Sequence, residues 1–280
     1  MLGSEAQPHT AIVRMNPLLE TKGLTRRFGD LVAVDNLTIS VAAGEVFALL
    51  GSNGAGKTVT MKMLTTLLRP SAGNARVAGF DIVHHAARVR GVIGYVPQLV
   101  SADGALTGYE NLLIFAKLYG LPRALRRERI EEALAFMGLA DVATKLVRQY
   151  SGGMIRRLEI AESMLHRPPV LFLDEPTVGL DPVAREAVWA RIQDLRQRYG
   201  TTIVFTTHVM DEADQLCTRL AIMHRGRVVA AGTPAELKAE MGGGEATLDD
   251  VFVHYAGGAM EMGGAFRSTS AARRTARRLG

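Results

Sequence analysis

Apolar positions along this chain follow two periods, and each period predicts a different kind of element. Largely apolar runs at residues 46–50, 170–173 and 201–206 predict strands buried on both faces, as in a parallel sheet. Residues 36–41 instead alternate between apolar and polar, which predicts a half-buried strand. Shorter strands are expected at residues 74–78, 91–97, 220–223 and 227–231.

Apolar residues spaced three and four positions apart predict helices, and they dominate residues 107–149. One such face contains Ile130, Ala133, Leu134 and Met137. Further helices are expected at residues 59–68, at 155–165, after the N-cap pair Asp181 and Pro182, and beyond Thr233. Strands alternating with helices on both sides of the helical stretch predict an α/β fold with a largely parallel sheet.

A last amphipathic helix is expected near the carboxyl end. Thr247 followed by Asp250 forms a capping-box pattern at its start. The apolar stripe behind this cap contains Leu248, Val251, Phe252 and Tyr255. The stripe predicts packing onto the core, with a self-association or partner surface as the alternative.

The composition is that of an ordinary globular protein. The 280 residues, 48% hydrophobic and 22% charged, suffice for one large domain or two small ones. The sequence contains no apolar run of the length that crosses a bilayer, and its first residues lack the apolar core of a signal peptide. Cys217 is the single cysteine, so no intrachain disulfide can form and a cytosolic location is expected.

The net charge of +5 comes from the end of the chain. Five arginines from Arg267 onward have no acidic neighbour, and without them the basic and acidic side chains balance at 28 each. This Ser/Ala/Arg tail is predicted to be disordered, either as a solvated end or as a segment attracted to anionic membrane lipid or a partner. A neutral body gives no reason to expect nucleic-acid binding.

The strand at 46–50 leads into a phosphate-loop motif, G-x-x-x-x-G-K-[ST]. Its residues are Gly51, Ser52, Asn53, Gly54, Ala55, Gly56, Lys57 and Thr58, followed by Val59. The glycines let backbone N–H groups approach a phosphate at a helix N-terminus. Lys57 is expected to reach the β- and γ-phosphates, and the Thr58 hydroxyl suits Mg²⁺. A glycine-rich turn that binds nothing is the alternative, which the flanking strand and helix disfavour.

The strand at 170–173 ends in two acidic residues, Asp174 and Glu175. Ligands of open α/β sheets bind at the carboxyl ends of the strands. Asp174 is therefore expected to hold Mg²⁺ through water, and Glu175 to orient or deprotonate a water that attacks the γ-phosphate. Without a phosphate loop in the chain, two surface acids at a strand end would be the better interpretation.

Ser151, Gly152 and Gly153 precede a predicted helix. Ser151 has the character of an N-cap, and the glycines expose backbone N–H groups. The stretch is either a second anion-binding helix start or an ordinary helix cap.

Taken together, these motifs resemble those of the ATP-binding subunits of ATP-binding-cassette (ABC) transporters. The matching pieces are GSNGAGKT at 51–58, YVPQ at 95–98, YSGGM at 150–154, VLFLDEP at 170–176, GLDP at 179–182 and TTHVMDEAD at 206–214. SGGM, GLDP and the ending TLDDVFVHYAGG further resemble exporter ATPases of the daunorubicin-resistance type. Met154 and Tyr150 stand where the family more often has glutamine and leucine, and neither change removes the serine or the glycines.

The resemblance implies roles for matching residues around one nucleotide. Gln98 would reach Mg²⁺ or the attacking water, and His208 would contact the γ-phosphate. Phe28 would stack on adenine, although the family usually has tyrosine there and Phe28 could belong to the core. A lone histidine after a buried strand is more often structural, and only the motif context makes His208 a functional candidate.

The resemblance also implies partners. Ser151, Gly152 and Gly153 would bind the γ-phosphate of ATP held by a second copy of the chain, in a head-to-tail dimer with Asp181 at its interface. The loop that begins at Gln98 would contact an integral-membrane permease. The chain would then lie at the cytoplasmic face of the cell membrane and power export.

The implied fold is an ABC ATPase: a phosphate-loop NTPase core with an N-terminal antiparallel β subdomain and an inserted helical subdomain. The expected divisions are a flexible leader at 1–17, the ATPase domain at 18–237, an extension at 238–258 and the basic tail at 259–280. Within the ATPase domain, 98–154 would be the helical subdomain, and 18–97 with 155–237 the core.

Two other classes of protein fit the sequence less well than a transporter subunit does. A soluble ABC ATPase acting on DNA or the ribosome would need a long coiled-coil insertion or a second cassette, and neither is present in the sequence. A GTPase or small-molecule kinase would have no use for the SGG stretch, and the guanine motif N-K-x-D is missing.

Overall fold

The computed structural model describes residues 17–241 and 246–257. Apart from Pro17, the predicted leader lies outside these residues, and so does the predicted basic tail.

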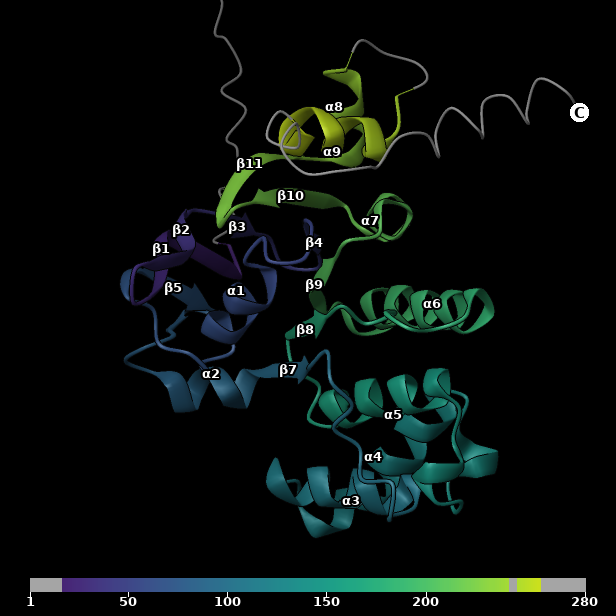
Figure 1. Ribbon diagram of the computed structural model, residues 1–280. Helices are drawn as coiled ribbons and strands as arrows, with labels where there is room; N and C mark the ends of the chain where they lie inside the picture. Colours follow the sequence, from purple (N-terminus) through teal and green to yellow (C-terminus); the bar gives the residue numbers. More distant parts are fainter. Residues whose placement is uncertain (1–16, 242–245, 258–280) are drawn as a thin grey trace, which may run out of the picture.

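A mostly parallel sheet forms the centre of the fold (Figure 1). Within the described residues its strand order is β11-β10-β4-β9-β8-β7, and only β11 runs antiparallel to its neighbour. The strands are β4 (Val46–Leu50), β7 (Ile93–Val96), β8 (Val170–Asp174), β9 (Thr202–Thr207), β10 (Arg219–His224) and β11 (Arg227–Gly232). The carboxyl ends of β4, β9 and β8 therefore lie side by side at one edge.

Both faces of the sheet are buried along β4, β8 and β9, which explains the continuous apolar runs of these strands. In β4, Phe47 and Leu49 belong to one hydrophobic core, whereas Ala48 and Leu50 belong to the other. The first core also takes in α1 (Lys57–Leu64), α2 (Ala86–Val92) and the antiparallel strands. The second core lies against α6 (Pro182–Tyr199), α7 (Met210–Leu216) and α9 (Leu248–Gly257), and α8 (Pro234–Ala239) contributes Leu237.

The antiparallel sheet lies beside α1 (Figure 1). Its strands are β1 (Leu19–Phe28), β2 (Leu31–Leu37), β3 (Ser40–Val41), β5 (Ala72–Val77) and β6 (Phe80–Asp81). The single strand predicted at 36–41 is wrong, because β2 ends at Leu37 and β3 begins at Ser40. Asn36 has a φ of +51°, which interrupts the extended backbone. The predicted alternation still holds, since Leu37, Ile39 and Val41 are buried.

Helix α2 was not expected, and it replaces the first part of the strand predicted at 91–97. Val89 is its one buried residue, so its sequence carries no apolar stripe. Helix α1 begins at Lys57 and ends at Leu64, four residues before the predicted end. The reversal follows at Thr66, whose φ is +65°.

The helical stretch forms a separate group of helices beyond β7 (Figure 1). It contains α3 (Gly108–Leu118), α4 (Arg123–Phe136), the 3-10 turns η1 (Ala140–Val142) and η2 (Val147–Gln149), and α5 (Gly152–Met164). Helix α5 begins three residues before the predicted start, directly after its N-cap Ser151. It packs against α3 and α4 on one side and against α6 and β7 on the other. This helix thus joins the helical group to the central sheet.

The stripe on α9 packs onto the core, as its spacing predicts. Leu248, Val251 and Phe252 are buried in the same core as α7. The Tyr255 hydroxyl donates to Glu240, and Thr247 caps the helix with Asp250.

Candidate active site

The phosphate loop joins β4 to α1, and its glycines are needed at their positions. Gly56 precedes α1 with a φ of +101°, and a Cβ atom there would lie 2.6 Å from the Ala33 carbonyl oxygen. A Cβ atom on Gly51 would lie 2.6 Å from the Met223 carbonyl oxygen. The backbone of the loop can therefore pass close to two neighbouring segments only without side chains.

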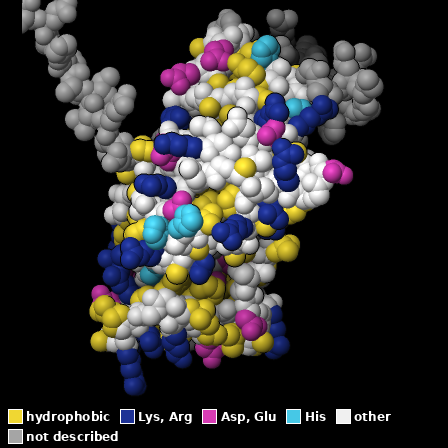
Figure 2. Space-filling view, turned by 90° about the vertical axis from the view of Figure 1, so that its left-hand side faces the viewer, with side chains coloured by type: hydrophobic (Ala, Val, Ile, Leu, Met, Phe, Trp, Pro, Cys, Tyr) yellow, Lys and Arg dark blue, Asp and Glu magenta, His cyan; other side chains and the backbone are white. Residues whose placement is uncertain are grey.

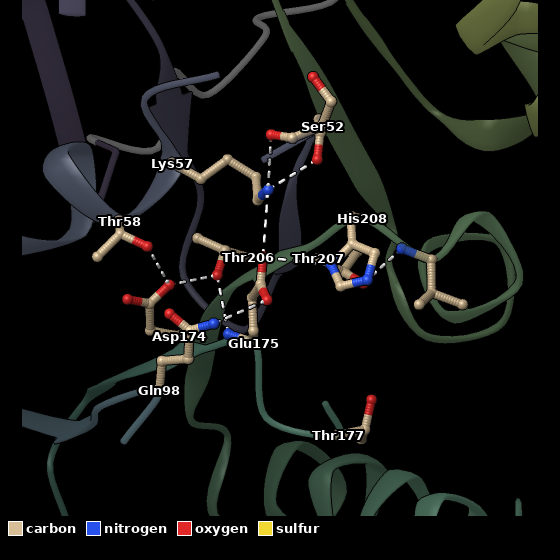
Figure 3. Close-up of polar contacts among 12 residues, drawn as sticks. Ser52, Lys57, Thr58, Gln98, Asp174, Glu175, Thr177, Thr206, Thr207 and His208 are labelled. Carbon is tan, nitrogen blue, oxygen red and sulfur yellow. Dashed lines mark hydrogen bonds and ion pairs between the residues drawn. The ribbon is translucent and has the colours of Figure 1, made fainter. Parts of the chain in front are cut away.

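Lys57 folds back across the mouth of this loop (Figure 3). Its ammonium donates to the carbonyl oxygens of Gly51 at 2.7 Å and Ser52 at 3.1 Å. It also lies 3.2 Å from Glu175 Oε1, in an ion pair of which both members are buried. A cation held this close to the loop can exchange a carbonyl partner for a phosphate oxygen.

Asp174 ends β8 beside Thr58, the last residue of the phosphate-loop motif. Its Oδ1 accepts the Thr58 hydroxyl at 3.2 Å and the Thr206 hydroxyl at 2.6 Å. Burial raises the pKa of Asp174, against the effect of these two hydrogen bonds. In the described residues, its Oδ2 is buried and makes no hydrogen bond. A buried carboxylate oxygen beside a hydroxyl is a donor set that fits Mg²⁺.

Glu175 is the residue on which the predicted catalytic side chains converge (Figure 3). Its Oε2 accepts the Gln98 amide at 3.2 Å, and its Oε1 lies 3.3 Å from His208 Nδ1. Gln98 follows β7 and His208 follows β9, so the strand order brings them together. The φ of Glu175 is +47°, a strained value for a side-chain-bearing residue, of a kind that clusters at functional sites.

Thr206 belongs to this cluster but was not predicted as a site residue. Its hydroxyl accepts the Glu175 N–H at 2.8 Å while donating to Asp174. The signal available in the sequence was its place in the run TTH, directly before the end of a buried strand.

The remaining predicted residues lie apart from this cluster. Ser151 caps α5 by accepting the Met154 N–H, and Asp181 caps α6 by accepting the Ala184 N–H. Gly153 lies where α5 approaches α6, since a Cβ atom on it would be 2.7 Å from Ala184 Cβ. Across the described residues, no hydrogen bond or ion pair connects Ser151, Gly152, Gly153 or Asp181 with the phosphate loop.

Phe28 ends β1 with 44% of its surface exposed. The Arg26 guanidinium lies 4.5 Å from the centre of its ring, over one face. Stacking of Phe28 on adenine stays a prediction. The same holds for the ligand roles of Ser52, Asn53, Gly54, Ala55 and Val59.

Sequence comparisons agree with the motif pattern. The family model described as "ABC transporter" matches residues 34–178. The daunorubicin/doxorubicin resistance ATP-binding protein DrrA of Streptomyces peucetius is 47% identical over 224 residues, which cover 80% of this chain and 68% of that protein. The Nod factor export ATP-binding protein I of Ralstonia nicotianae is 45% identical over 231 residues, covering 82% and 72%.

Comparison with solved structures also finds components of ABC transporters. A solved ATP-binding subunit of an ABC transporter is 31% identical, with a TM-score of 0.76 over 85% of this chain and 99% of that one. The cbiO1 protein of Clostridium perfringens, part of the ABC transporter complex cbiONQ, is 30% identical with a TM-score of 0.72 over 80% and 92%.

Proposed function

Since this chain belongs to the ABC transporter family, we propose that two copies close around two ATP molecules and power export through a separate membrane permease. Family membership makes the chain an ATP-binding and ATP-hydrolysing subunit. The site roles, the dimer and the permease are argued below.

ATP would bind with its phosphates in the loop that joins β4 to α1. Lys57 would pair with the β- and γ-phosphates, and the N–H groups around Gly54 and Gly56 would donate to phosphate oxygens. Mg²⁺ would be held by Thr58 and Asp174, with Gln98 nearby, and would neutralise charge that develops on the phosphates. The buried, unbonded Oδ2 of Asp174 in the described chain supports this assignment.

Glu175 would orient and deprotonate the attacking water. The observation that carries this role is the convergence of Gln98, Lys57 and His208 on its carboxylate, each within 3.3 Å. Binding of ATP would draw Lys57 toward the phosphates and release one oxygen of Glu175 to accept a proton. The His208 side chain, 39% exposed, would then contact the γ-phosphate.

The dimer would supply the other half of each site. Ser151 and Gly152 are exposed at the start of α5, where helix N–H groups point outward. Within the described chain, no hydrogen bond joins these groups to the phosphate loop of their own copy, which supports binding to ATP held by the other copy. Each ATP would then be held by the loop of one copy and Ser151 of its partner, and hydrolysis would remove the bridging phosphate.

Export through a permease rests on the relatives named above, which include drug-resistance and Nod-factor export ATP-binding proteins. In the described segments no helix has the length and apolar character to cross a membrane. Figure 2 shows apolar side chains gathered low on one face, at the height of the helical group. Leu99, Val100 and Leu118 are among the exposed apolar residues, and we propose that they contact the permease at the cytoplasmic face of the membrane.

The test is Glu175→Gln, with the exposed Glu128→Gln of α4 as control. We expect Glu175→Gln to bind ATP with unchanged affinity, to lose turnover by at least 100-fold, and to elute as a dimer only when ATP is present. Hydrolysis by Glu175→Gln at the parental rate would show that Glu175 is not the base. A monomer at saturating ATP would refute the shared sites.

A further inference from the structure

Helix α5 carries a buried ion pair that none of the predicted roles uses. Arg156 and Glu159 lie one turn apart, 3.0 Å from each other, with side chains 6% and 1% exposed. A buried pair of this kind is costly to desolvate unless further hydrogen bonds satisfy both groups. The partners of the two side chains therefore indicate what the pair does.

All of those partners lie in the loop that follows β7. The Arg156 guanidinium donates to the carbonyl oxygens of Pro97 at 2.8 Å and Gln98 at 3.0 Å. Glu159 Oε1 accepts the backbone N–H of Ser101 at 2.5 Å and its hydroxyl at 3.0 Å. The pair thus holds the backbone of residues 97–101 at both ends.

The same loop carries Gln98, whose amide donates to Glu175 Oε2 at 3.2 Å. Between the two points of attachment, Leu99 and Val100 are exposed, so the loop has little other packing of its own. The place of the Gln98 side chain beside Glu175 consequently depends on where α5 lies.

Helix α5 is also the helix whose N-cap is Ser151, five residues before Arg156. At a rise of about 1.5 Å per residue, the two positions are about 7 Å apart on one rigid element. A displacement of the helix start is therefore transmitted to the backbone of Gln98 without an intervening flexible joint.

We propose that Arg156 and Glu159 are positioning residues that hold the Gln98 side chain against Glu175. They would also couple the position of Gln98 to that of the N-terminal end of α5, which Ser151 caps. This inference rests on the proposed roles of Gln98 and Glu175. Its consequence is that engagement of Ser151 by the ATP of one site moves Gln98 in the other site of the dimer. The pair would then make the rate of ATP hydrolysis at one site depend on ATP bound at the other, while leaving the affinity of the phosphate loop for ATP unchanged.

The test uses Arg156→Lys in the full chain. Lysine keeps the charge but lacks the planar fork that reaches two carbonyl oxygens and Glu159 together. The matched control is Arg126→Lys in α4, because Arg126 likewise donates to a backbone carbonyl oxygen, that of Leu121 at 2.8 Å, and is remote from both the loop and Ser151 in the chain. The measurements are steady-state ATP hydrolysis, equilibrium binding of a fluorescent ATP analogue, and the melting temperature.

We expect Arg156→Lys to lower kcat at least ten-fold and to change the ATP dissociation constant less than two-fold. Arg126→Lys should keep kcat within two-fold whatever its melting temperature. Combined with Gln98→Ala, Arg156→Lys should lower kcat little further, because both changes remove one arrangement. Glu159→Gln is the second variant, should Arg156→Lys fail to fold, and the same pattern is expected of it.

The outcomes separate this inference from the function on which it rests. Unchanged kcat in Arg156→Lys would overturn the positioning role. So would a double variant whose fold loss in kcat equals the product of the losses caused by Arg156→Lys and Gln98→Ala alone. Neither result would contradict the proposed role of Gln98. Unchanged kcat in Gln98→Ala would overturn the role of Gln98 itself, and the inference with it. A loss of ATP affinity or melting temperature alone would reduce the pair to a structural contact.

Discussion

The hydroxyl of Thr206 donates to Asp174 Oδ1 at 2.6 Å, and both residues are buried. The same hydroxyl accepts the backbone N–H of Glu175 at 2.8 Å. One side chain on β9 thus fixes the two neighbouring acids at the end of β8. Because Glu175 has a left-handed backbone conformation, which is unfavourable for a residue with a side chain, this contact also helps to stabilise that conformation.

We predict that Thr206→Val lowers kcat at least ten-fold and destabilises the protein. Valine has nearly the same shape, but it removes the shorter of the two hydrogen bonds to Asp174 Oδ1 and leaves the buried Glu175 N–H without a partner. An unsatisfied buried group costs about 1–3 kcal/mol. Thr206→Ser keeps the hydroxyl and is expected to retain kcat within about three-fold of the parent. Steady-state hydrolysis and differential scanning fluorimetry measure both effects. Parental kcat in Thr206→Val would contradict the role of the hydroxyl.

Gly56→Ala is expected to weaken ATP binding at least ten-fold and to lower the melting temperature. The added Cβ would meet the Ala33 carbonyl oxygen at 2.6 Å, so the phosphate loop would have to move. The control is Gly79→Ala, since Gly79 also has a positive φ but has no atom within 4 Å of an added Cβ. Gly79→Ala should carry only the backbone strain of about 1–2 kcal/mol. Equal ATP affinity in the two variants would show that the close approach at Gly56 is unimportant.

Glu212 is buried and links three segments, because its Oε1 accepts the Thr177 hydroxyl at 2.8 Å and the Trp189 indole N–H at 3.0 Å. We expect Glu212→Ala to lower the free energy of unfolding by about 2–4 kcal/mol, since two buried donors lose their acceptor. Glu212→Gln keeps an oxygen in place and should cost less. Trp189 is the single tryptophan, so its fluorescence in urea titrations reports the transition directly. Equal midpoints for the two variants would refute the account.

Glu162 makes stability depend on pH. Burial, and secondarily the charge of Glu159, raise its pKa from 4.5 to about 8. Between these values the folded chain keeps the proton that the unfolded chain releases, so the free energy of unfolding falls as the pH rises. Glu162→Gln is uncharged at every pH and should remove this slope.

The melting temperature of Glu162→Gln minus that of the parent is expected to be larger at pH 8 than at pH 5 by at least about 5 °C. The basis is about 1.4 kcal/mol per unit of pKa difference. The control Glu128→Gln, at an exposed position, should melt at the same temperature as the parent at both pH values. Parallel curves for Glu162→Gln and the parent would mean that Glu162 is ionised in the folded protein.

Local patterns in the sequence were sufficient for much of the fold. The two-sided burial of β4, β8 and β9 follows from their apolar runs, and the caps at Ser151 and Asp181 follow from residue type and position. The motif order correctly indicated the ABC family. Where the local signal was weak, as in α2 with its one buried residue, the element was missed.

By itself, then, the sequence determined which segments form buried strands, which residues cap two helices, and which side chains could meet a nucleotide. Only the tertiary structure decided that Thr206 forms a hydrogen bond with Asp174, 32 residues earlier in the chain. The same is true of Arg156 and Glu159, which hold a loop that lies 58 residues before them. The physical reason is that periodicity and capping act between near neighbours in the chain. Contacts at the ends of β7, β8 and β9 depend instead on the order in which distant strands pair.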